Sequence, residues 1–409
     1  MASLKLQITP VVFECPPSRH DPPGRALKMT AKRYWTHESE ANEEGFSLLF
    51  AHCIGGHKEQ WEPVIEQTFR TQACKARHQR VREAWSLDWQ SHGDAAILNA
   101  ELLQSSRQEG VSAYEWAEAI AAFVRTPWMQ GRRIVGIGHS GGAGAMIMSL
   151  KSVPLPAIPF LAFVLVEPTM AKQKLFDRTM GPQIPGIKAA TLLQRDKWNS
   201  REDARAWLEG RKPWKRWDRQ VLGLFVEHGL TDTPDGVTLK CTRRLEALAF
   251  PDVQPHFDAV EELDRIAGEV PVHLVWASRS ELVCVIVSLP SSAPLPVVFL
   301  VSLRPVILAY CYFLPFPPSH ASIPILPYVF PPFAFNPKVL QNDLSESPEG
   351  KRRFASITRL EGGHLIPHES PTRVAHAICA ALDAVGGYGA RGTESIITVS
   401  FVFAGEGCG

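Results

Sequence analysis

The eight cysteines of this chain show no paired spacing, and that absence argues against two classes of protein. They lie at positions 15, 53, 74, 241, 284, 311, 379 and 408. A disulfide framework would need regular intervals, and a zinc-binding module would need close pairs of ligands. The sequence therefore predicts a reducing compartment, with no disulfide scaffold and no metal-ligand cluster.

An excess of charge of one sign is also missing. The chain has 43 Lys and Arg against 42 Asp and Glu, for a net charge of +1, and the two kinds are interspersed. Such a balance leaves no electrostatic footprint for nucleic acid, and no glycine-rich phosphate loop is present. Residues 1–8 lack the apolar core of a secretion signal, and residues 407–409 are not a peroxisomal address of the Ser-Lys-Leu type.

Charged side chains are nearly absent from residues 282–337, which hold Arg304 and twelve prolines. Apolarity over such a length is typical of a membrane span. The longest proline-free runs, 297–304 and 306–314, are however shorter than the ~20 residues that a spanning helix needs. We interpret the segment as an apolar, Pro-rich insertion, such as translated intronic sequence, that contributes no part of the core; membrane association through it is not favoured.

Ser140 lies at the centre of a motif in which a strand, a sharp turn and a helix are expected. The motif, Gly138-His139-Ser140-Gly141-Gly142, follows the apolar run 133–137 and precedes the small-residue run 143–146. Glycines at the flanking positions let the backbone turn tightly and expose the serine oxygen above the helix N-terminus. This pattern is a nucleophile elbow, and it predicts that Ser140 is a catalytic nucleophile.

A second turn, upstream of Ser140, is the expected source of an oxyanion donor. The segment FSLLFA at 46–51 predicts a buried strand that leads into His52-Cys53-Ile54-Gly55-Gly56-His57. By position, the backbone N–H groups of Ile54 and Gly141 would face a developing oxyanion, each worth roughly 3 kcal/mol. The alternative is that this glycine pair forms an ordinary loop.

His364 is the expected general base. It lies in the segment Glu361-Gly362-Gly363-His364-Leu365-Ile366-Pro367-His368-Glu369, between a short strand at 354–360 and an amphipathic stretch at 371–382. A histidine on a late strand-to-helix loop, after the serine in the chain, fits the order of residues in a triad on such a fold. His368 is the second candidate, although it is expected at the start of the following helix.

Two carboxylates are candidates for the residue that orients the histidine. Glu167 ends the apolar run 160–166, and Glu281 follows the run 270–276, one residue later in its loop than is usual. Either carboxylate could stabilise an imidazolium. We prefer Glu167 slightly, because the sequence beyond Glu281 changes character, and both remain open.

These motifs together resemble the α/β-hydrolase superfamily, and more narrowly fungal hydrolases that include peroxisomal lipase-like and toxin-biosynthesis proteins. The narrower resemblance covers roughly residues 1–281 and 335–383. It rests on HKEQWEP at 57–63, WSLD at 85–88 with HGD at 92–94 and Asn99, VEP at 166–168 and VEHGL at 226–230. Cys53 stands where the superfamily usually has glycine in its His-Gly pair. A serine nucleophile argues against the epoxide hydrolase and dehalogenase branches, which use an aspartate.

The expected elements alternate between strands and helices, which predicts a doubly wound, mainly parallel α/β-hydrolase sheet with a helical cap. We expect a first core part at 1–168, the cap at 169–265, a core strand at 266–281, the insertion at 282–337, a final core part with the catalytic His at 338–385 and an uncharacteristic tail at 386–409. Opening strands are expected at 4–15 and 26–36, and a helix at 112–125. Tryptophans 198, 207, 214 and 217 would line the lid or pack within the cap.

The sequence therefore predicts a serine hydrolase that cleaves an ester, thioester or related acyl bond of a small to medium apolar substrate through an acyl-enzyme. It needs no cofactor and no metal. Two alternatives stay open: a ligand-binding pseudo-enzyme without catalysis, and carbon–carbon hydrolase or lyase-type chemistry on the same fold. A cytoplasmic or peroxisomal location is expected, and the oligomeric state is left open.

Overall fold

The computed structural model of the 409-residue chain describes residues 5–279, 297–303, 306–312 and 338–388. The chain separates into two units, one formed by residues 1–287 and 337–409 and the other by residues 288–336. In the smaller unit, β11 (Val297–Leu303) pairs antiparallel with β12 (Val306–Tyr312). Glu281, most of the expected insertion and the tail from residue 389 lie outside the described residues.

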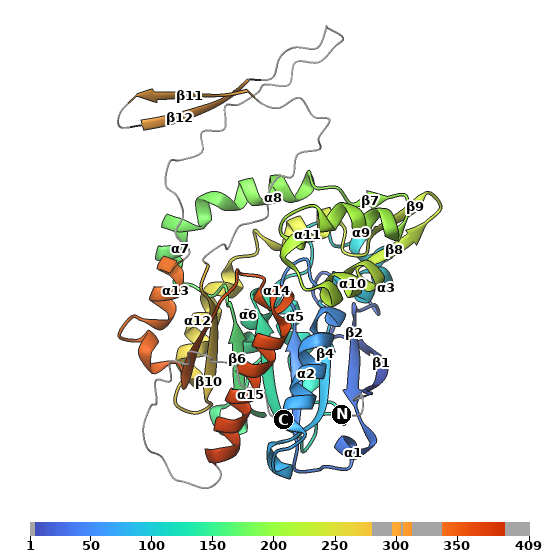
Figure 1. Ribbon diagram of the computed structural model, residues 1–409, viewed down its shortest axis with the longest axis vertical. Helices are drawn as coiled ribbons and strands as arrows, with labels where there is room; N and C mark the ends of the chain where they lie inside the picture. Colours follow the sequence, from blue (N-terminus) through green and yellow to red (C-terminus); the bar gives the residue numbers. More distant parts are fainter. Residues whose placement is uncertain (1–4, 280–296, 304–305, 313–337, 389–409) are drawn as a thin grey trace. The chain divides into compact units, whose positions relative to one another are not determined.

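An eight-stranded sheet lies at the centre of the larger unit, in the order β1-β2-β4-β3-β5-β6-β10-β13 (Figure 1). Its strands are β1 (Gln7–Glu14), β2 (Lys28–Trp35), β3 (Phe46–Ala51), β4 (Val81–Leu87), β5 (Arg133–His139), β6 (Phe160–Val166), β10 (Val272–Ala277) and β13 (Ser356–Leu360). β2 pairs antiparallel with β1 and β4, and the remaining pairs are parallel. The predicted doubly wound, mainly parallel α/β fold is confirmed.

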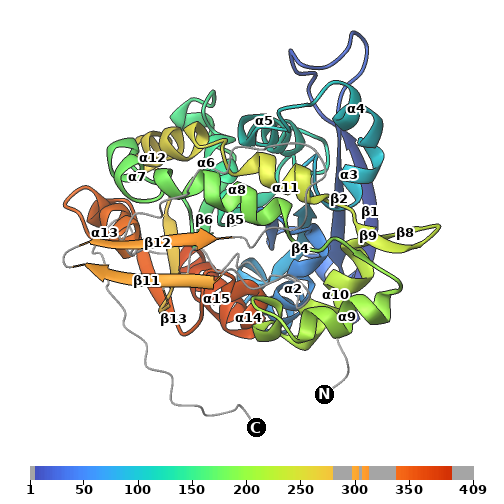
Figure 2. The ribbon, with the colours of Figure 1, turned by 90° about the horizontal axis from the view of Figure 1, so that it is seen from above.

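Helices cover both faces of this sheet (Figure 2). One face carries α2 (Glu62–Gln72) and α15 (Pro371–Tyr388), and the other carries α5 (Ala113–Val124), α6 (Gly141–Met148) and α12 (Gln254–Ile266). Successive side chains of a strand point to opposite faces. In β3, Leu49 therefore packs in the α5, α6 and α12 cluster, whereas Leu48 and Phe50 pack against α2 and α15. Burial on both faces explains why five of the six residues of this strand are apolar.

The range expected to form a cap holds helices and a small sheet. The helices are α7 (Gln173–Thr179), α8 (Ile184–Leu192), α9 (Arg201–Glu209), α10 (Arg219–His228) and α11 (Arg243–Ala249). The antiparallel strands β7 (Lys197–Trp198), β9 (Gly236–Leu239) and β8 (Leu230–Thr233) were not predicted from the sequence. Trp198 and Trp214 pack with Leu208 and Phe225 in an apolar cluster of their own. Helix α12, at the end of the same range, packs in the core cluster instead.

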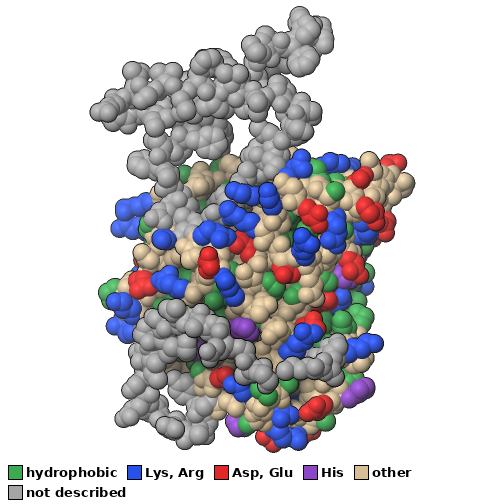
Figure 3. All heavy atoms as spheres, in the orientation of Figure 1, with side chains coloured by type: hydrophobic (Ala, Val, Ile, Leu, Met, Phe, Trp, Pro, Cys, Tyr) green, Lys and Arg blue, Asp and Glu red, His purple; other side chains and the backbone are tan. Residues whose placement is uncertain are grey.

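Shorter helices connect these parts: α1 (His37–Glu40), η1 (Lys58–Trp61), α3 (Gly93–Leu98), α4 (Ala100–Ser105), α13 (Lys338–Ser345) and α14 (Ile366–Glu369). Within the described ranges, none of the helices has the length and apolarity needed to cross a membrane. On the face shown in Figure 3, lysine and arginine side chains lie among aspartates and glutamates over the described surface.

Candidate active site

Ser140 forms the turn between β5, which ends at His139, and α6, which begins at Gly141. Its backbone has φ +54° and ψ −121°, a conformation that costs a residue other than glycine about 1–3 kcal/mol. The turn is tied to the neighbouring strand, because the Ser140 N–H donates to the Val166 carbonyl at 3.0 Å. The surrounding sheet thus holds the serine in a strained position above the helix N-terminus.

The flanking glycines are required by close approach of the backbone. A Cβ on Gly142 would lie 2.3 Å from the carbonyl oxygen of His52, and one on Gly138 would lie 2.4 Å from the Cα of Ala143. Both distances are far inside van der Waals contact. The glycines therefore let α6 pack directly against the ends of β3 and β5.

His364 contacts both Ser140 and Glu167. Its Nε2 lies 2.9 Å from Ser140 Oγ, and its Nδ1 lies 3.1 Å from Glu167 Oε2. An ionised carboxylate only accepts hydrogen bonds, so Nδ1–H donates to Glu167 and Nε2 accepts from the Ser140 hydroxyl. The three residues follow β5, β6 and β13. Because parallel strands bring their carboxyl ends to one edge of the sheet, these side chains meet there.

Glu167 is buried, with 1% of its surface exposed, and is held by further contacts. Its φ is +47°, and its Oε1 accepts the Ala277 N–H at 2.5 Å and the Gln341 Nε2 at 3.2 Å. These bonds leave Oε2 aimed at the imidazole. Sequence analysis did not single out Gln341, since a glutamine on an amphipathic helix carries no recognisable signal.

The loop that carries His364 is held at several points. The Gly363 N–H donates to Glu369 Oε2 at 3.1 Å, and His139 Nε2–H donates to the His364 carbonyl at 2.8 Å. His368, the second candidate base, lies in α14 with its ring centroid 4.5 Å from that of Trp217. Ser140 donates its hydroxyl hydrogen bond to His364 and not to His368, and burial lowers the pKa of His368 to about 3.

The turn after β3 lies beside Ser140. Gly55 has φ +74°, and its N–H donates to His92 Nε2 at 3.1 Å. Burial keeps the pKa of His92 well below its usual value, so the imidazole is neutral and its Nε2 can accept this hydrogen bond. A Cβ on Gly141 would lie 3.5 Å from the Ile54 side chain, so the two residues expected to supply the oxyanion donors are neighbours. Gly141 begins α6, so its N–H has no partner within the helix.

A pocket of about 180 Å³ opens onto Ser140 and His364. Its wall is largely apolar, and most of that wall comes from residues 169–265. The apolar side chains from that range are Phe176, Met180, Ile184, Pro213, Trp214, Trp217, Phe225, Phe250 and Val253. An apolar group in this pocket would therefore lie against the serine oxygen.

Comparison with known proteins agrees with the geometry. Residues 48–377 match the model of the Alpha/beta hydrolase family. The chain belongs to this family. It is accordingly a hydrolase, as the sequence analysis predicted. No protein of curated function matches the chain in sequence.

Solved structures share the fold at low sequence identity. The peroxisomal alpha-beta-hydrolase Lpx1 from Saccharomyces cerevisiae is 13% identical with a TM-score of 0.64, over 97% of this chain and 93% of that one. E-2-(acetamidomethylene)succinate hydrolase is 15% identical with a TM-score of 0.55, over 92% of this chain and 100% of that one. The thioesterase domain from the curacin biosynthetic pathway is 13% identical with a TM-score of 0.52, over 92% and 99%. At such identities the likeness concerns the fold alone.

Proposed function

We propose that this hydrolase is a serine esterase or thioesterase in which Ser140, His364 and Glu167 form the catalytic triad. The observation that carries the proposal is the continuous chain of hydrogen bonds from Ser140 Oγ through the imidazole to Glu167, at 2.9 and 3.1 Å. The strained backbone of Ser140 supports it, since such strain gathers at functional sites. Glu281, which lies outside the described residues, is the alternative acid.

The reaction proceeds through an acyl-enzyme. Ser140 Oγ attacks the acyl carbonyl carbon while His364 Nε2 accepts the hydroxyl proton, and Glu167 stabilises the resulting imidazolium. The N–H groups of Ile54 and Gly141 stabilise the oxyanion by roughly 3 kcal/mol each. The imidazolium then protonates the leaving alcohol or thiol. In the second half of the reaction His364 deprotonates a water molecule, whose oxygen attacks the acyl carbon. The bond from that carbon to Ser140 Oγ then breaks, His364 returns the proton to Oγ, and the acid leaves.

The substrate class follows from the pocket next to the nucleophile. Side chains such as Phe176, Trp217 and Phe225 favour an apolar acyl or alkyl group, and a volume of about 180 Å³ favours a group of small to medium size. No residue in this scheme requires a cofactor. A cytoplasmic or peroxisomal location stays a prediction.

The test is covalent labelling with a fluorophosphonate probe. We expect the parent protein to label, and Ser140→Ala to lose both the label and at least ~10³-fold of the hydrolysis of p-nitrophenyl esters. Ser149→Ala is the matched control, because Ser149 is equally buried at the end of the same helix, and this variant should label like the parent.

Labelling and hydrolysis that survive in Ser140→Ala would refute the serine mechanism. A folded parent protein that neither labels nor hydrolyses any ester would favour the pseudo-enzyme. Labelling without ester or thioester hydrolysis would direct the search to carbon–carbon bonds.

A further inference from the structure

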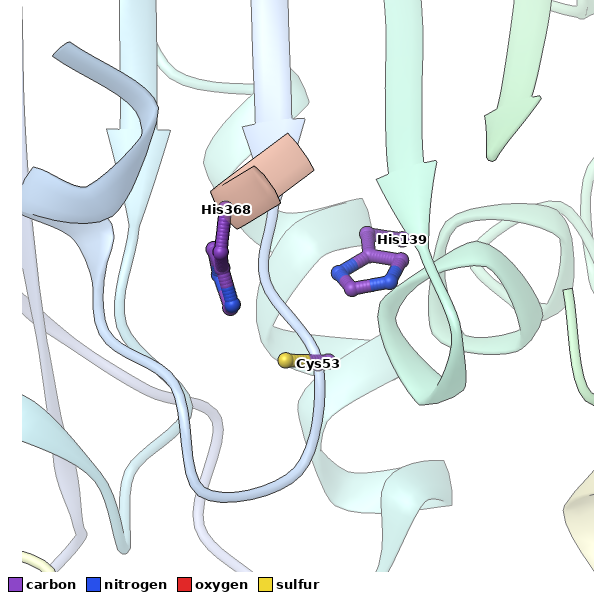
Figure 4. Close-up of side chains that lie close together, drawn as sticks. All are labelled: Cys53, His139 and His368. Atoms are coloured by element: carbon purple, nitrogen blue, oxygen red, sulfur yellow. The ribbon is translucent and has the colours of Figure 1, made fainter. Parts of the chain in front are cut away.

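Next to the triad, three buried side chains from distant parts of the chain face one another (Figure 4). Cys53 lies in the turn after β3, His139 ends β5, and His368 belongs to α14. One donor atom of each lies within 4.8 Å of the other two, and the residues are 4%, 1% and 3% exposed. We propose that these side chains bind one zinc ion and that the bound ion inhibits the hydrolase.

The donor set suits zinc. One thiolate and two imidazoles are among the ligands that Zn²⁺ takes in tetrahedral sites, with a fourth position left for water. On coordination the S–Zn bond forms as the S–H bond of Cys53 breaks, and the proton leaves to solvent.

Both histidines present a nitrogen that is available for a metal. His139 donates its Nε2–H to the His364 carbonyl at 2.8 Å, so its Nδ1 carries the lone pair. A ring N–H donated to a backbone carbonyl is the usual arrangement behind a metal-bound imidazole. His368 Nδ1 is buried and has no hydrogen-bond partner among the described residues, which is uncommon for a buried polar atom.

A route into the site exists. Cys53 and His368 line the pocket that opens onto Ser140, whereas His139 is not part of its wall. A zinc ion can therefore enter through the pocket intended for substrate. Water in the same pocket supplies the fourth ligand.

Binding would fix the geometry of the site. Zn–N bonds of about 2.0 Å and a Zn–S bond of about 2.3 Å hold tetrahedral donors roughly 3.3–3.6 Å apart, whereas the three donors here lie within 4.8 Å of one another. Cys53 precedes the donor Ile54, and His139 precedes Ser140. A displacement of about 1 Å in such positions can cost 10²-fold in rate. This inhibitory part rests on the proposed function, whereas zinc binding does not.

The experiment measures metal binding directly. Each variant is made in a Cys74→Ser background, because Cys74 is an exposed free thiol. Zinc sulfate alone is titrated by calorimetry, and Co²⁺ is used as a probe whose thiolate charge-transfer band reports a Cys–metal bond. We expect one equivalent of zinc per chain and a Co²⁺ band that Cys53→Ser abolishes. His368→Gln should weaken zinc at least ~10-fold.

The controls match the ligands in type and burial. Cys379 is 4% exposed like Cys53, and His273 is 3% exposed like His368, so Cys379→Ser and His273→Gln should bind zinc like the parent. Equal binding by parent and Cys53→Ser, or no binding at micromolar zinc, would overturn the site.

Inhibition is measured separately, as fluorophosphonate labelling with and without zinc. Zinc should slow labelling of the parent at least ~10-fold and leave Cys53→Ser unaffected. Stoichiometric zinc with unchanged labelling would overturn the inhibitory part alone. A parent that binds zinc and never labels would indicate failure of the proposed function.

Discussion

Ser140 and Glu167 are the non-glycine residues with positive φ among those the structure describes, at +54° and +47°. They lie at the carboxyl ends of adjacent parallel strands, where His139 pairs with Val166. Each backbone is held by a sheet bond, from Ser140 N–H to the Val166 carbonyl and from Glu167 N–H to the Val275 carbonyl, at 3.0 and 2.9 Å. Strain that the surrounding structure maintains in this way is typical of residues with a functional role.

For a single residue, Glu167→Gln should lower the turnover number by ~10³-fold to 10⁴-fold. The amide lacks the negative charge that stabilises the imidazolium, and its NH₂ group can force the wrong tautomer of His364. Ester hydrolysis and thermal unfolding of the variant check the prediction, with Glu281→Gln as the comparison. An active Glu167→Gln beside an inactive Glu281→Gln would transfer the role to Glu281, and two active variants would exclude both.

Two glycines of helix α6 differ in how closely neighbouring atoms approach them. At Gly142 a Cβ would lie 2.3 Å from the His52 carbonyl oxygen, so the helix and the end of β3 would have to separate. At Gly144 the nearest atom to a Cβ is 3.8 Å away, on His256, which is ordinary contact. The position of Ser140 therefore depends on backbone contact at one glycine and not at the other.

Gly142→Ala should accordingly destabilise the protein by about 1–3 kcal/mol and reduce labelling of Ser140. Gly144→Ala, on the same helix, should be neutral or stabilise by up to about 1 kcal/mol, because alanine favours helix over glycine. Urea unfolding and labelling rates measure both effects. Equal stability of the two variants would contradict this account of the packing.

At the scale of the whole molecule, the central sheet buries a titratable group. His273 lies in β10, between β6 and β13, with Nδ1 2.8 Å from Ser356 Oγ. Burial lowers the pKa of His273 to about 4, against about 6.5 in the unfolded chain. Between these values the unfolded state binds more protons than the folded state, so stability falls as the pH falls.

The free energy of unfolding should therefore decrease from pH 6.5 to pH 4, with His273 contributing up to about 1.4 kcal/mol per pH unit. His256, whose pKa burial also lowers to about 4, acts in the same direction. Urea unfolding at several pH values tests the prediction. His273→Gln should reduce the slope of the free energy of unfolding against pH by the equivalent of about one proton. An unchanged slope would show that His273 does not contribute.

Much of this protein could be predicted from local sequence. The apolar runs before Ser140 and Glu167, the glycines around the turns, and the order of strands and helices indicated the α/β-hydrolase fold, which is confirmed. The same patterns indicated Ser140 as the nucleophile and His364 as the general base. The structure places Ser140 Oγ 2.9 Å from His364 Nε2, and the catalytic roles of both residues stay predictions. These signals are local because turn chemistry and strand burial act within a few residues.

Only the tertiary structure decided which groups meet across long separations. It brought Glu167 to a histidine 197 residues away, and it aimed Gln341 from α13 at the same carboxylate. It also assembled Cys53, His139 and His368 in one place, where sequence spacing had predicted no metal-ligand cluster. Residue spacing along the chain does not indicate which of these residues meet. Their contacts depend on which strand ends share an edge of the sheet, and on how closely α6 and the loop at His364 pack at that edge.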